Sequence, residues 1–388
     1  ESYLAAPPPP YDISSLNFAG ELRGLELGRR QRNLQLIPYG LAGVLREDAG
    51  DGEGETTDSV TEAGLDLKYS LTSDLALNAT VNTDFSQVEA DDLQVNLTRF
   101  SLFYPEKREF FLENAELFSF GHGGGFGDHP PEVTPFFSRR IGIFEGETVP
   151  IDGGLRLTGK VGRSDLGLLS VRTGGVDELG LDPVWYNVAR LRTDLGGRSY
   201  IGGILTDARI DGERSTTYGL DGTWYLSQDL SFLADVMRVE DSRIGDSTSA
   251  VYAGLDLTTD PWGFLFSYRE IDEGFAPAVG FVRREGFRSG SGSLRRSVRP
   301  GRWGVRRVSL RVFGDAYESL AYDLTESTAV SLMSEVELEN GDRVDLGVRR
   351  SFERLFEPFA LDDDLIFAPG DYSFSEWWVE YESDESKR

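Results

Sequence analysis

The sequence predicts an all-β fold, an antiparallel transmembrane β-barrel of about 16–18 strands that belongs in the cell outer membrane. Three observations lead to this fold class. Segment after segment alternates apolar and polar residues with the period of a β-strand, not the 3.6-residue period of a helix. The polar positions in mid-strand carry full charges, as at Asp66, Lys68 and Arg156. Short turns alternate with longer polar loops, which is typical of the two ends of an outer-membrane barrel.

The composition is consistent with this class. The chain has 388 residues, of which 39% are hydrophobic and 12% aromatic. No apolar run approaches the ~18 residues that a membrane-spanning helix needs, whereas in a barrel strand only every second residue meets lipid. The net charge of −27 argues against nucleic acid as a partner. Because the chain has no cysteine, disulfides and thiolate metal sites are excluded, and no cofactor is predicted.

The two ends of the chain differ in composition from the alternating segments of its middle. Residues 1–16 contain the stiff stretch "APPPP" and are expected to link a missing N-terminal domain to the rest. Residues 17–388 are expected to form the barrel. The final stretch "WWVEYESDESKR" is not the apolar strand with a terminal aromatic that ends an outer-membrane barrel, so we expect that the last strands are absent.

The strands can be followed along the chain by their alternation. In "TEAGLDLKYSL" the odd-numbered residues from Ala63 to Leu71 are apolar, and Asp66 and Lys68 fall on the other face. The odd residues of 63–85 are therefore predicted to face lipid. The same pattern recurs in "GLRLTGKVG", "YGLDGTWYL", "VYAGLDL" and "RVSLRVF". A soluble β-propeller or sandwich also alternates, but the charged mid-strand positions and the aromatics at strand ends favour a membrane barrel.

The connections predict the direction of the strands. Short turns, expected at one end of the barrel, are 72–74, 163–165, 195–198, 227–229, 258–261, 299–301 and 340–342. Longer polar loops, expected at the other end, are 46–58, 174–183, 211–215 and 241–247. If 75–87 and 92–104 are consecutive wall strands, the chain has to cross between the ends within 105–150. The crossing is either an extra wall strand near 135–144 or a path through the lumen.

The stretch "PEKREFFLENAELFSF", residues 105–120, breaks the alternation with a cluster of charges among phenylalanines. We interpret the region around 105–150 as an inserted plug or rim segment, whose charges face the lumen while its aromatic residues, including Phe118, pack against the inner wall. The Arg139–Arg140 pair would complement Glu106, Glu113 or Asp84, because confined charges require partners. The alternative is a periplasmic loop with weak surface ion pairs. The candidate lumen and plug residues are Asp84, Glu106, Lys107, Arg108, Phe110, Phe111, Glu113, Arg139 and Arg140.

Other motifs do not predict a reaction. "GHGGGFGDHP" contains His122 and His129, the two histidines of the chain, and is similar to the oxyanion loop of esterases. No G-x-S-x-G elbow accompanies it, so a glycine-rich loop is the favoured interpretation and no catalytic residue is predicted. The acidic segments 46–58 and 361–365 have carboxylates that could bind calcium, but without EF-hand spacing, and the question of a metal stays open.

The sequence from Asp66 to Gly121, with the later "FFSRRIG" and "VGFVRRE", resembles one family. This family is the outer-membrane β-barrel domain that commonly follows a carbohydrate-binding family 9-like domain in exported Gram-negative proteins. The resemblance is dense over 64–142 and sparser over 17–63 and 143–290. It implies a barrel in the outer membrane but no established reaction or substrate. The carbohydrate-binding-like domain of the family is not present in this sequence.

The expected function is that of a transport or porin-like channel for glycans or other small polar solutes. The alternative is a non-conducting structural or assembly barrel that anchors a surface or periplasmic partner protein. Outer-membrane lipid and lipopolysaccharide are the expected surroundings of either. An outer-membrane hydrolase that uses His122 and His129 is the third and least favoured alternative.

Overall fold

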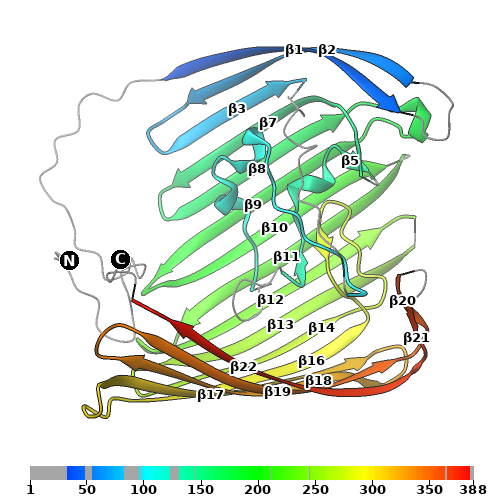
Figure 1. Ribbon diagram of the computed structural model, residues 1–388. Helices are drawn as coiled ribbons and strands as arrows, with labels where there is room; N and C mark the ends of the chain where they lie inside the picture. Colours follow the sequence, from blue (N-terminus) through cyan, green and yellow to red (C-terminus); the bar gives the residue numbers. More distant parts are fainter. Residues whose placement is uncertain are drawn as a thin grey trace, which may run out of the picture.

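The computed structural model describes residues 33–48, 55–82, 96, 98–122, 131–144, 146–210, 212–243, 245–362 and 365–384. Its main feature is one antiparallel sheet of 16 strands in which sequential strands pair with one another. Figure 1 shows this sheet curling into the wall of a barrel, from the blue strands β1 and β2 to the red strand β22. The predicted all-β antiparallel fold and the predicted strand number are confirmed.

The strands of the wall share a length that suits a bilayer, since most of them have ten or more residues. In spatial order they are β1 (Leu34–Asp48), β2 (Glu55–Ser70), β3 (Leu75–Val81), β7 (Ile151–Val161), β8 (Ser164–Thr173), β9 (Trp185–Gly196), β10 (Ser199–Ile210), β11 (Glu213–Tyr225), β12 (Leu230–Asp241), β13 (Asp246–Thr258), β14 (Trp262–Ile271), β16 (Phe287–Val298), β17 (Val305–Ser319), β18 (Leu324–Leu338), β19 (Arg343–Leu355) and β22 (Gly370–Glu382).

Each wall strand shows two different faces because successive side chains of a strand point to opposite sides. In β7, Leu155 is 55% exposed, whereas its neighbour Arg156 is 1% exposed. The exposed large apolar side chains form a band over the outer face, from Leu36 on β1 to Val379 on β22. Water-soluble proteins rarely expose so large a contiguous apolar surface, whereas a membrane barrel requires one.

The connections differ between the two ends of the wall, as predicted. Seven short connections, at 71–74, 162–163, 197–198, 226–229, 259–261, 299–304 and 339–342, fall at one end because neighbouring strands are antiparallel. The long connections 82–150, 272–286 and 356–369 fall at the other end. Two predicted long loops are shorter than expected. Only two residues separate Ile210, the end of β10, from Glu213, the start of β11, and only four separate Asp241, the end of β12, from Asp246, the start of β13.

The long connection between β3 and β7 is the inserted segment. Its regular elements are α1 (Glu109–Leu112), the 3₁₀ turns η2 (Ala115–Phe118) and η3 (Ser138–Arg140), and the short strands β4 (Val133–Thr134), β5 (Ile143–Phe144) and β6 (Glu147–Thr148). Figure 1 shows these elements on the concave side of the sheet, where they cross the lumen. The predicted plug is therefore present, and we call residues 105–122, 131–144 and 146–150 the plug.

The predicted wall strand at 92–104 is not present in the described residues. The described part of 92–104, residues 96 and 98–104, is bend and coil and not a wall strand. Strand β3 pairs directly with β7, with Leu75 opposite Gly159 and Val81 opposite Gly153. The chain therefore leaves the wall and returns to it at the same end, and 135–144 supplies no wall strand. The lumenal location is right, but the crossing between ends that motivated it is wrong.

Two smaller sheets and one turn complete the fold. The connection 272–286 also folds inward, because its strand β15 (Phe281–Val282) pairs with β4 of the plug. Strands β20 (Phe359–Asp362) and β21 (Leu365–Phe367) form a hairpin in the last long connection, and the 3₁₀ turn η4 (Asp177–Leu179) lies between β8 and β9. The hydrophobic core consists of plug residues, the 272–286 connection and inward side chains of the wall.

Within the described residues, β1 and β22 pair with β2 and β19 and not with each other. The predicted linker 1–16 lies outside the described residues, so the domain boundaries and the expected absence of closing strands stay predictions.

Candidate functional site

The plug begins with an internal ion pair between Glu106 and Arg108. The Arg108 guanidinium donates from Nε to Glu106 Oε1 (2.9 Å) and from Nη2 to Glu106 Oε2 (2.7 Å). It also donates to the backbone oxygens of Ile141 (2.6 Å) and Ser138 (2.8 Å), and the Ser138 hydroxyl donates to Glu106 Oε2 (2.6 Å). Burial alone would raise the pKa of Glu106, but the hydrogen bonds and charge of Arg108 outweigh it and lower that pKa. This arrangement ties the two halves of the plug together.

The next part of the plug is anchored to the wall through Glu113. Its Oε2 lies 3.2 Å from Lys68 Nζ and 3.4 Å from Arg156 Nη2, and it accepts a hydrogen bond from Asn78 Nδ2 (2.8 Å). Lys68 also binds Glu109 (2.7 Å), and this contact lowers the pKa of Glu109. Lys68, Asn78 and Arg156 come from β2, β3 and β7, so this anchor joins three neighbouring strands.

The aromatic side chains of the plug pack where the inner wall has glycine. A Cβ atom placed on Gly154 would lie 3.1 Å from the Phe110 ring, and one on Gly167 would lie 2.9 Å from the Phe118 ring. The predicted packing of Phe110, Phe111 and Phe118 agrees with their burial, since each is less than 9% exposed. The inward glycines therefore make room for rings that could not otherwise approach the strands.

A second anchor lies at residues 119–122, where the chain reaches the middle of the wall. Arg190 of β9 and Asp221 of β11 form a bidentate ion pair with both side chains 1% exposed. Arg190 donates to the Ser119 oxygen (2.9 Å), and Asp221 Oδ2 accepts from the Gly121 N–H (3.1 Å). The Phe120 ring lies 5.2 Å from the Arg190 guanidinium.

His122 completes this second anchor. Its backbone N–H donates to Asp235 Oδ2 (3.0 Å), and its Nδ1 lies 3.3 Å from the same oxygen. Its Nε2 lies 2.9 Å from the Thr223 hydroxyl, its ring stacks on Tyr252, and its backbone oxygen accepts from Arg269 (2.8 Å). His122 is therefore fully engaged in holding the plug against β11–β14.

Two regions of the wall, which together include all its strands except β1 and β2, differ in what covers their inner faces. We call β3 and β7–β14 the plugged wall, because the plug covers their inner faces. We call β16–β19 and β22 the open wall, because several of their inward charged side chains keep substantial exposure; the Arg307 side chain, for example, is 34% exposed and that of Arg343 46%.

Two cavities adjoin the open wall. The first, of about 510 Å³, is lined by strands β16–β19 and β22 together with Thr258 of β13, and combines Arg295, Arg307 and Arg311 with the carboxylates of Glu335, Asp345 and Glu380. The second, of about 440 Å³, lies between residues 99–101, the inward connection 272–286 and β18. Both are polar spaces inside the barrel, and both suit small charged or polar solutes.

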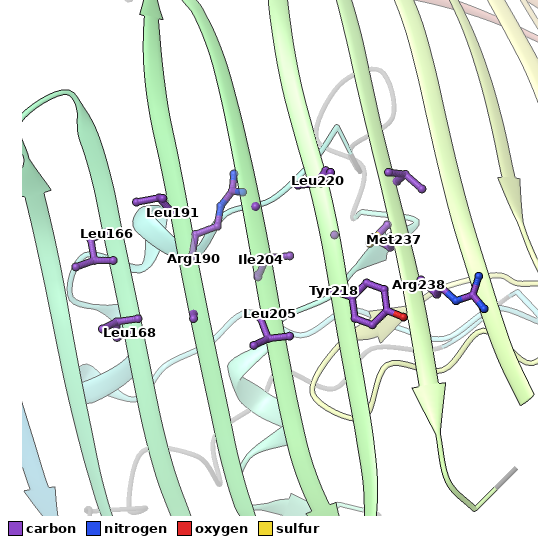
Figure 2. Close-up of a pocket in the computed structure, with 14 residues that line it drawn as sticks. Leu166, Leu168, Arg190, Leu191, Ile204, Leu205, Tyr218, Leu220, Met237 and Arg238 are labelled. Atoms are coloured by element: carbon purple, nitrogen blue, oxygen red, sulfur yellow. The ribbon is translucent and has the colours of Figure 1, made fainter. Parts of the chain in front are cut away.

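A third hollow lies on the outer face and has a different character. It has a volume of about 620 Å³ and lies over β8–β12, where Gly203 and Ala189 leave space between larger side chains. Figure 2 shows the leucines that surround it on successive strands, among them Leu168, Leu191 and Leu205. Because this groove is apolar and faces outward, we assign it to the lipid-facing surface and not to the lumen.

The structure brings together some of the predicted site residues. Glu106, Arg108, Phe110, Phe111 and Glu113 lie in the plug and contact each other or the wall. The Lys107 backbone N–H donates to Glu106 Oε1 (3.0 Å).

Other predicted residues are placed differently or not described. Arg139 donates to the Pro105 oxygen (3.1 Å) and Arg140 to the Gly280 oxygen (3.1 Å). The partners of Glu106 and Glu113 are instead Arg108, Lys68, Asn78 and Arg156, so the expected pairing of these two glutamates with Arg139 and Arg140 is wrong, whereas the pairing with Asp84 is not tested. Chain proximity explains this result, because Arg108 is two residues from Glu106. Asp84 and His129 lie outside the described residues.

Sequence reasoning missed the wall residues that hold the plug: Asn78, Arg190, Thr223, Asp235 and Arg269. A signal existed, because they occupy inward positions of their strands. Which of the many inward polar residues meet the plug is decided by its path, which the alternation does not encode.

Within the described part of the chain, no group of three or more His, Cys, Asp or Glu is placed to hold a metal ion. The acidic segment 46–58, like Asp363 and Asp364, falls outside what the structure describes in side-chain detail. Among the described residues, no helix is long and apolar enough to cross a membrane.

Comparisons with known proteins find one family model and a set of solved structures. A family model described as a domain of unknown function (DUF5916) matches residues 31–150, which span β1–β3 and the plug. No curated protein matches. The chain is similar to the crystal structure of Pseudomonas aeruginosa OpdL (TM-score 0.32, 12% identity, covering 90% of this chain and 97% of that one).

Two further solved structures are similar at the same level. They are Pseudomonas aeruginosa OpdQ (TM-score 0.36, 10% identity, 90% of this chain and 93% of that one) and Acinetobacter baumannii OccAB4 (TM-score 0.32, 9% identity, 90% and 99%). Likenesses this distant assign no function. The apolar outer face, the polar inner face and the asymmetric ends are the features of an outer-membrane β-barrel, whose strands cross the bilayer.

Proposed function

We propose that this protein is a porin-like transport barrel of the outer membrane that passes small polar solutes along its open wall. The observation that supports this proposal most is the contrast between the two walls. The plug occupies the lumen beside the plugged wall, where Arg156 and Arg190 are almost fully buried. The open wall keeps its charged inner face accessible and adjoins two polar cavities.

The charge pattern of the open wall favours polar solutes over apolar ones. Arginines and carboxylates alternate across the strands, as in the ion pair of Arg307 Nη2 with Glu335 Oε1 (3.0 Å). Pairs of this kind at exposed positions contribute little to stability, and they can exchange a partner for a passing solute at small cost. Glycans are one candidate class of solute, because hydroxyl groups bind well to such mixed donors and acceptors.

The proposal is tested by single-channel recording of the purified full-length protein in planar bilayers. We expect steady or gated current. A matched variant, Arg307→Gln, changes a charge on the open wall and should alter the ion selectivity, whereas Arg209→Gln, on the outward face of β10, should not. Absence of current from protein that is correctly folded and inserted would overturn the channel function.

The second candidate is a non-conducting barrel that anchors a surface or periplasmic partner protein. The buried anchors of the plug favour it, because they hold the lumen in one fixed state. This candidate would be supported if the protein carried no current in bilayers and a second protein co-purified with it in stoichiometric amount. We propose no enzymatic activity: both ring nitrogens of His122 face Thr223 and Asp235 in the second anchor.

Outer-membrane lipid is the proposed partner of the outer face. An acyl chain of a neighbouring lipid fits the groove over β8–β12, since its outward side chains are mostly leucines.

A further inference from the structure

One cavity beside the open wall has an unusual density of cations. The cavity of about 440 Å³ is lined by four arginines, Arg99, Arg140, Arg283 and Arg284. They come from three separate segments: the chain before the plug, the plug itself at η3, and the inward connection 272–286. Segments that lie far apart in the sequence thus place their guanidinium groups around one space.

The carboxylates around this cavity are shared among the arginines. Glu326 of β18 lies 2.6 Å from Arg99 Nη2 through one oxygen and 2.7 Å from Arg284 Nη2 through the other. Arg283 pairs with Glu132 (3.0 Å), and Arg99 also lies 3.2 Å from Glu353.

Arg140 stands apart from this network. In the described part of the chain its guanidinium makes one hydrogen bond, from Nε to the Gly280 oxygen (3.1 Å), and no ion pair. The residue is exposed to the cavity that it lines. Its two terminal nitrogens are free to bind a solute, and a planar guanidinium fork matches a carboxylate.

Glu285 is the second carboxylate that lines the cavity, and its negative charge offsets the positive charge of the arginines only in part. Burial and the neighbouring charge of Glu273 raise its pKa. A group with a raised pKa is protonated more easily when a further anion approaches it.

An apolar surface lies next to the arginines. The Phe100 ring has three guanidinium carbons near it, those of Arg99 (5.2 Å), Arg283 (5.6 Å) and Arg284 (5.1 Å). Phe275 also lines the cavity. The Phe275 side chain is 0% exposed, so a solute with an apolar body could lie against the Phe100 ring while its anionic group meets Arg140.

We propose that this cavity binds a small organic anion, through a carboxylate held by Arg140 and an apolar body against Phe100. The proposal rests on the transport function and names its substrate class. The volume lies near the lower end of the range for small-molecule sites, roughly 300–1,000 Å³, so it suits a compact solute. Inorganic phosphate offers the same oxyanion chemistry but no body for the aromatic surface.

The test is a calorimetric titration of the full-length protein in detergent micelles with adipate and with adipamide. The two probes have the same size and differ in charge. We expect adipate to bind and adipamide to bind at least about tenfold more weakly, because a hydrogen bond to a charged group is worth about that factor. Inorganic phosphate should bind more weakly than adipate.

Variants locate the site. Arg140→Gln should weaken adipate binding about tenfold. Arg140→Lys keeps the positive charge but loses the planar guanidinium group, so its affinity for adipate should lie between that of Arg140→Gln and that of the unmodified protein. Arg209→Gln removes the same charge from the outer face of β10 and should leave the affinity unchanged. Unchanged heat-modifiable migration on gels shows that each variant is folded.

Equal affinities for adipate and adipamide, or an Arg140→Gln variant that binds adipate normally, would overturn the site. Phosphate that binds as tightly as adipate would overturn the recognition of an organic body. The titration does not depend on conductance. If the protein binds adipate but carries no current in bilayers, the proposed channel function is overturned and the binding site is not. If the protein carries current but does not bind adipate, the binding site is overturned and the channel function is not.

Discussion

The plugged wall and the open wall follow the same sequence rule but place their inward side chains in different environments. In both, polar and charged residues alternate with outward apolar ones. On the plugged wall, the side chains of the Arg190–Asp221 ion pair are each 1% exposed. On the open wall, the side chains of the Arg343–Asp345 ion pair are 46% and 27% exposed. The plug causes this difference, because residues 119–122 cover the Arg190–Asp221 pair and take the place of water there.

The comparison shows that an ion pair has to be judged by what covers it. Removing one member of a buried pair leaves an uncompensated charge, whereas exposed pairs contribute little. The buried Arg190–Asp221 pair holds the plug, whereas in the proposed function the exposed pairs of the open wall are the ones that meet solutes.

The largest expected effect comes from breaking the buried pair. Asp221→Asn leaves the Arg190 guanidinium buried without its counter-charge and should reduce the free energy of unfolding by about 3–5 kcal/mol. Asp345→Asn on the open wall should cost about 1 kcal/mol or less. Denaturant unfolding in detergent measures both, and equal losses would show that the two walls do not differ.

A smaller effect is expected where the plug meets glycine. A Cβ atom on Gly219 would lie 2.6 Å from the Phe120 ring, so Gly219→Ala should force the ring away and cost about 1–3 kcal/mol. Gly290 of β16 has nothing within 4 Å of an added Cβ, and Gly290→Ala serves as the control. The same unfolding measurement applies, and faster proteolysis of the plug should accompany the loss. A neutral Gly219→Ala would mean that Phe120 does not need this close approach.

The plug should also loosen in acid. Since the folded-state pKa of Glu106 is lowered from 4.5, its ion pair with Arg108 stabilises the plug fully above the unfolded value. This contribution is lost as the pH falls through the lowered folded pKa. Hydrogen exchange of 105–122, followed from about pH 6 to about pH 3, should therefore speed up in acid beyond its intrinsic pH dependence. Glu106→Gln should raise the exchange rate of 105–122 at the higher pH and reduce the increase of that rate in acid. If the increase in acid were the same in this variant, another group than Glu106 would cause the acid sensitivity.

The smallest effect distinguishes the two faces of one strand. Gly203 faces the outer groove, and a Cβ there would lie 3.4 Å from Leu220, so Gly203→Ala should change stability by less than about 0.5 kcal/mol. The adjacent Gly202 faces inward, where a Cβ would lie 2.5 Å from Arg190 Nη1, and Gly202→Ala should cost about 1–3 kcal/mol. Reversal of this order would contradict the assignment of inner and outer faces.

Much of this architecture could be predicted from local pattern. The period of two identifies most wall strands and their faces, and the charged break at 105–120 locates the plug. The pattern failed at 92–104, which alternates like a strand, because pairing depends on which strand is available as a neighbour. It also failed for the partners of Glu113, since Arg156 comes beside Lys68 and Asn78 only because β3 pairs with the distant strand β7, with Lys68 opposite Asn78 and Asn78 opposite Arg156. Lumenal contacts between distant segments are a property of the assembled barrel.

The position of the plug has a consequence for the time course of folding. The contact between His122 and Arg269 joins residues 147 positions apart, and that between Glu132 and Arg283 joins residues 151 apart. Contacts of such long range form slowly, because closing the loop between the two residues costs conformational entropy before the contact contributes any stabilisation. The second anchor is complete only when β14 has taken its place, so we expect the last step of folding to be the docking of an early segment onto a late one.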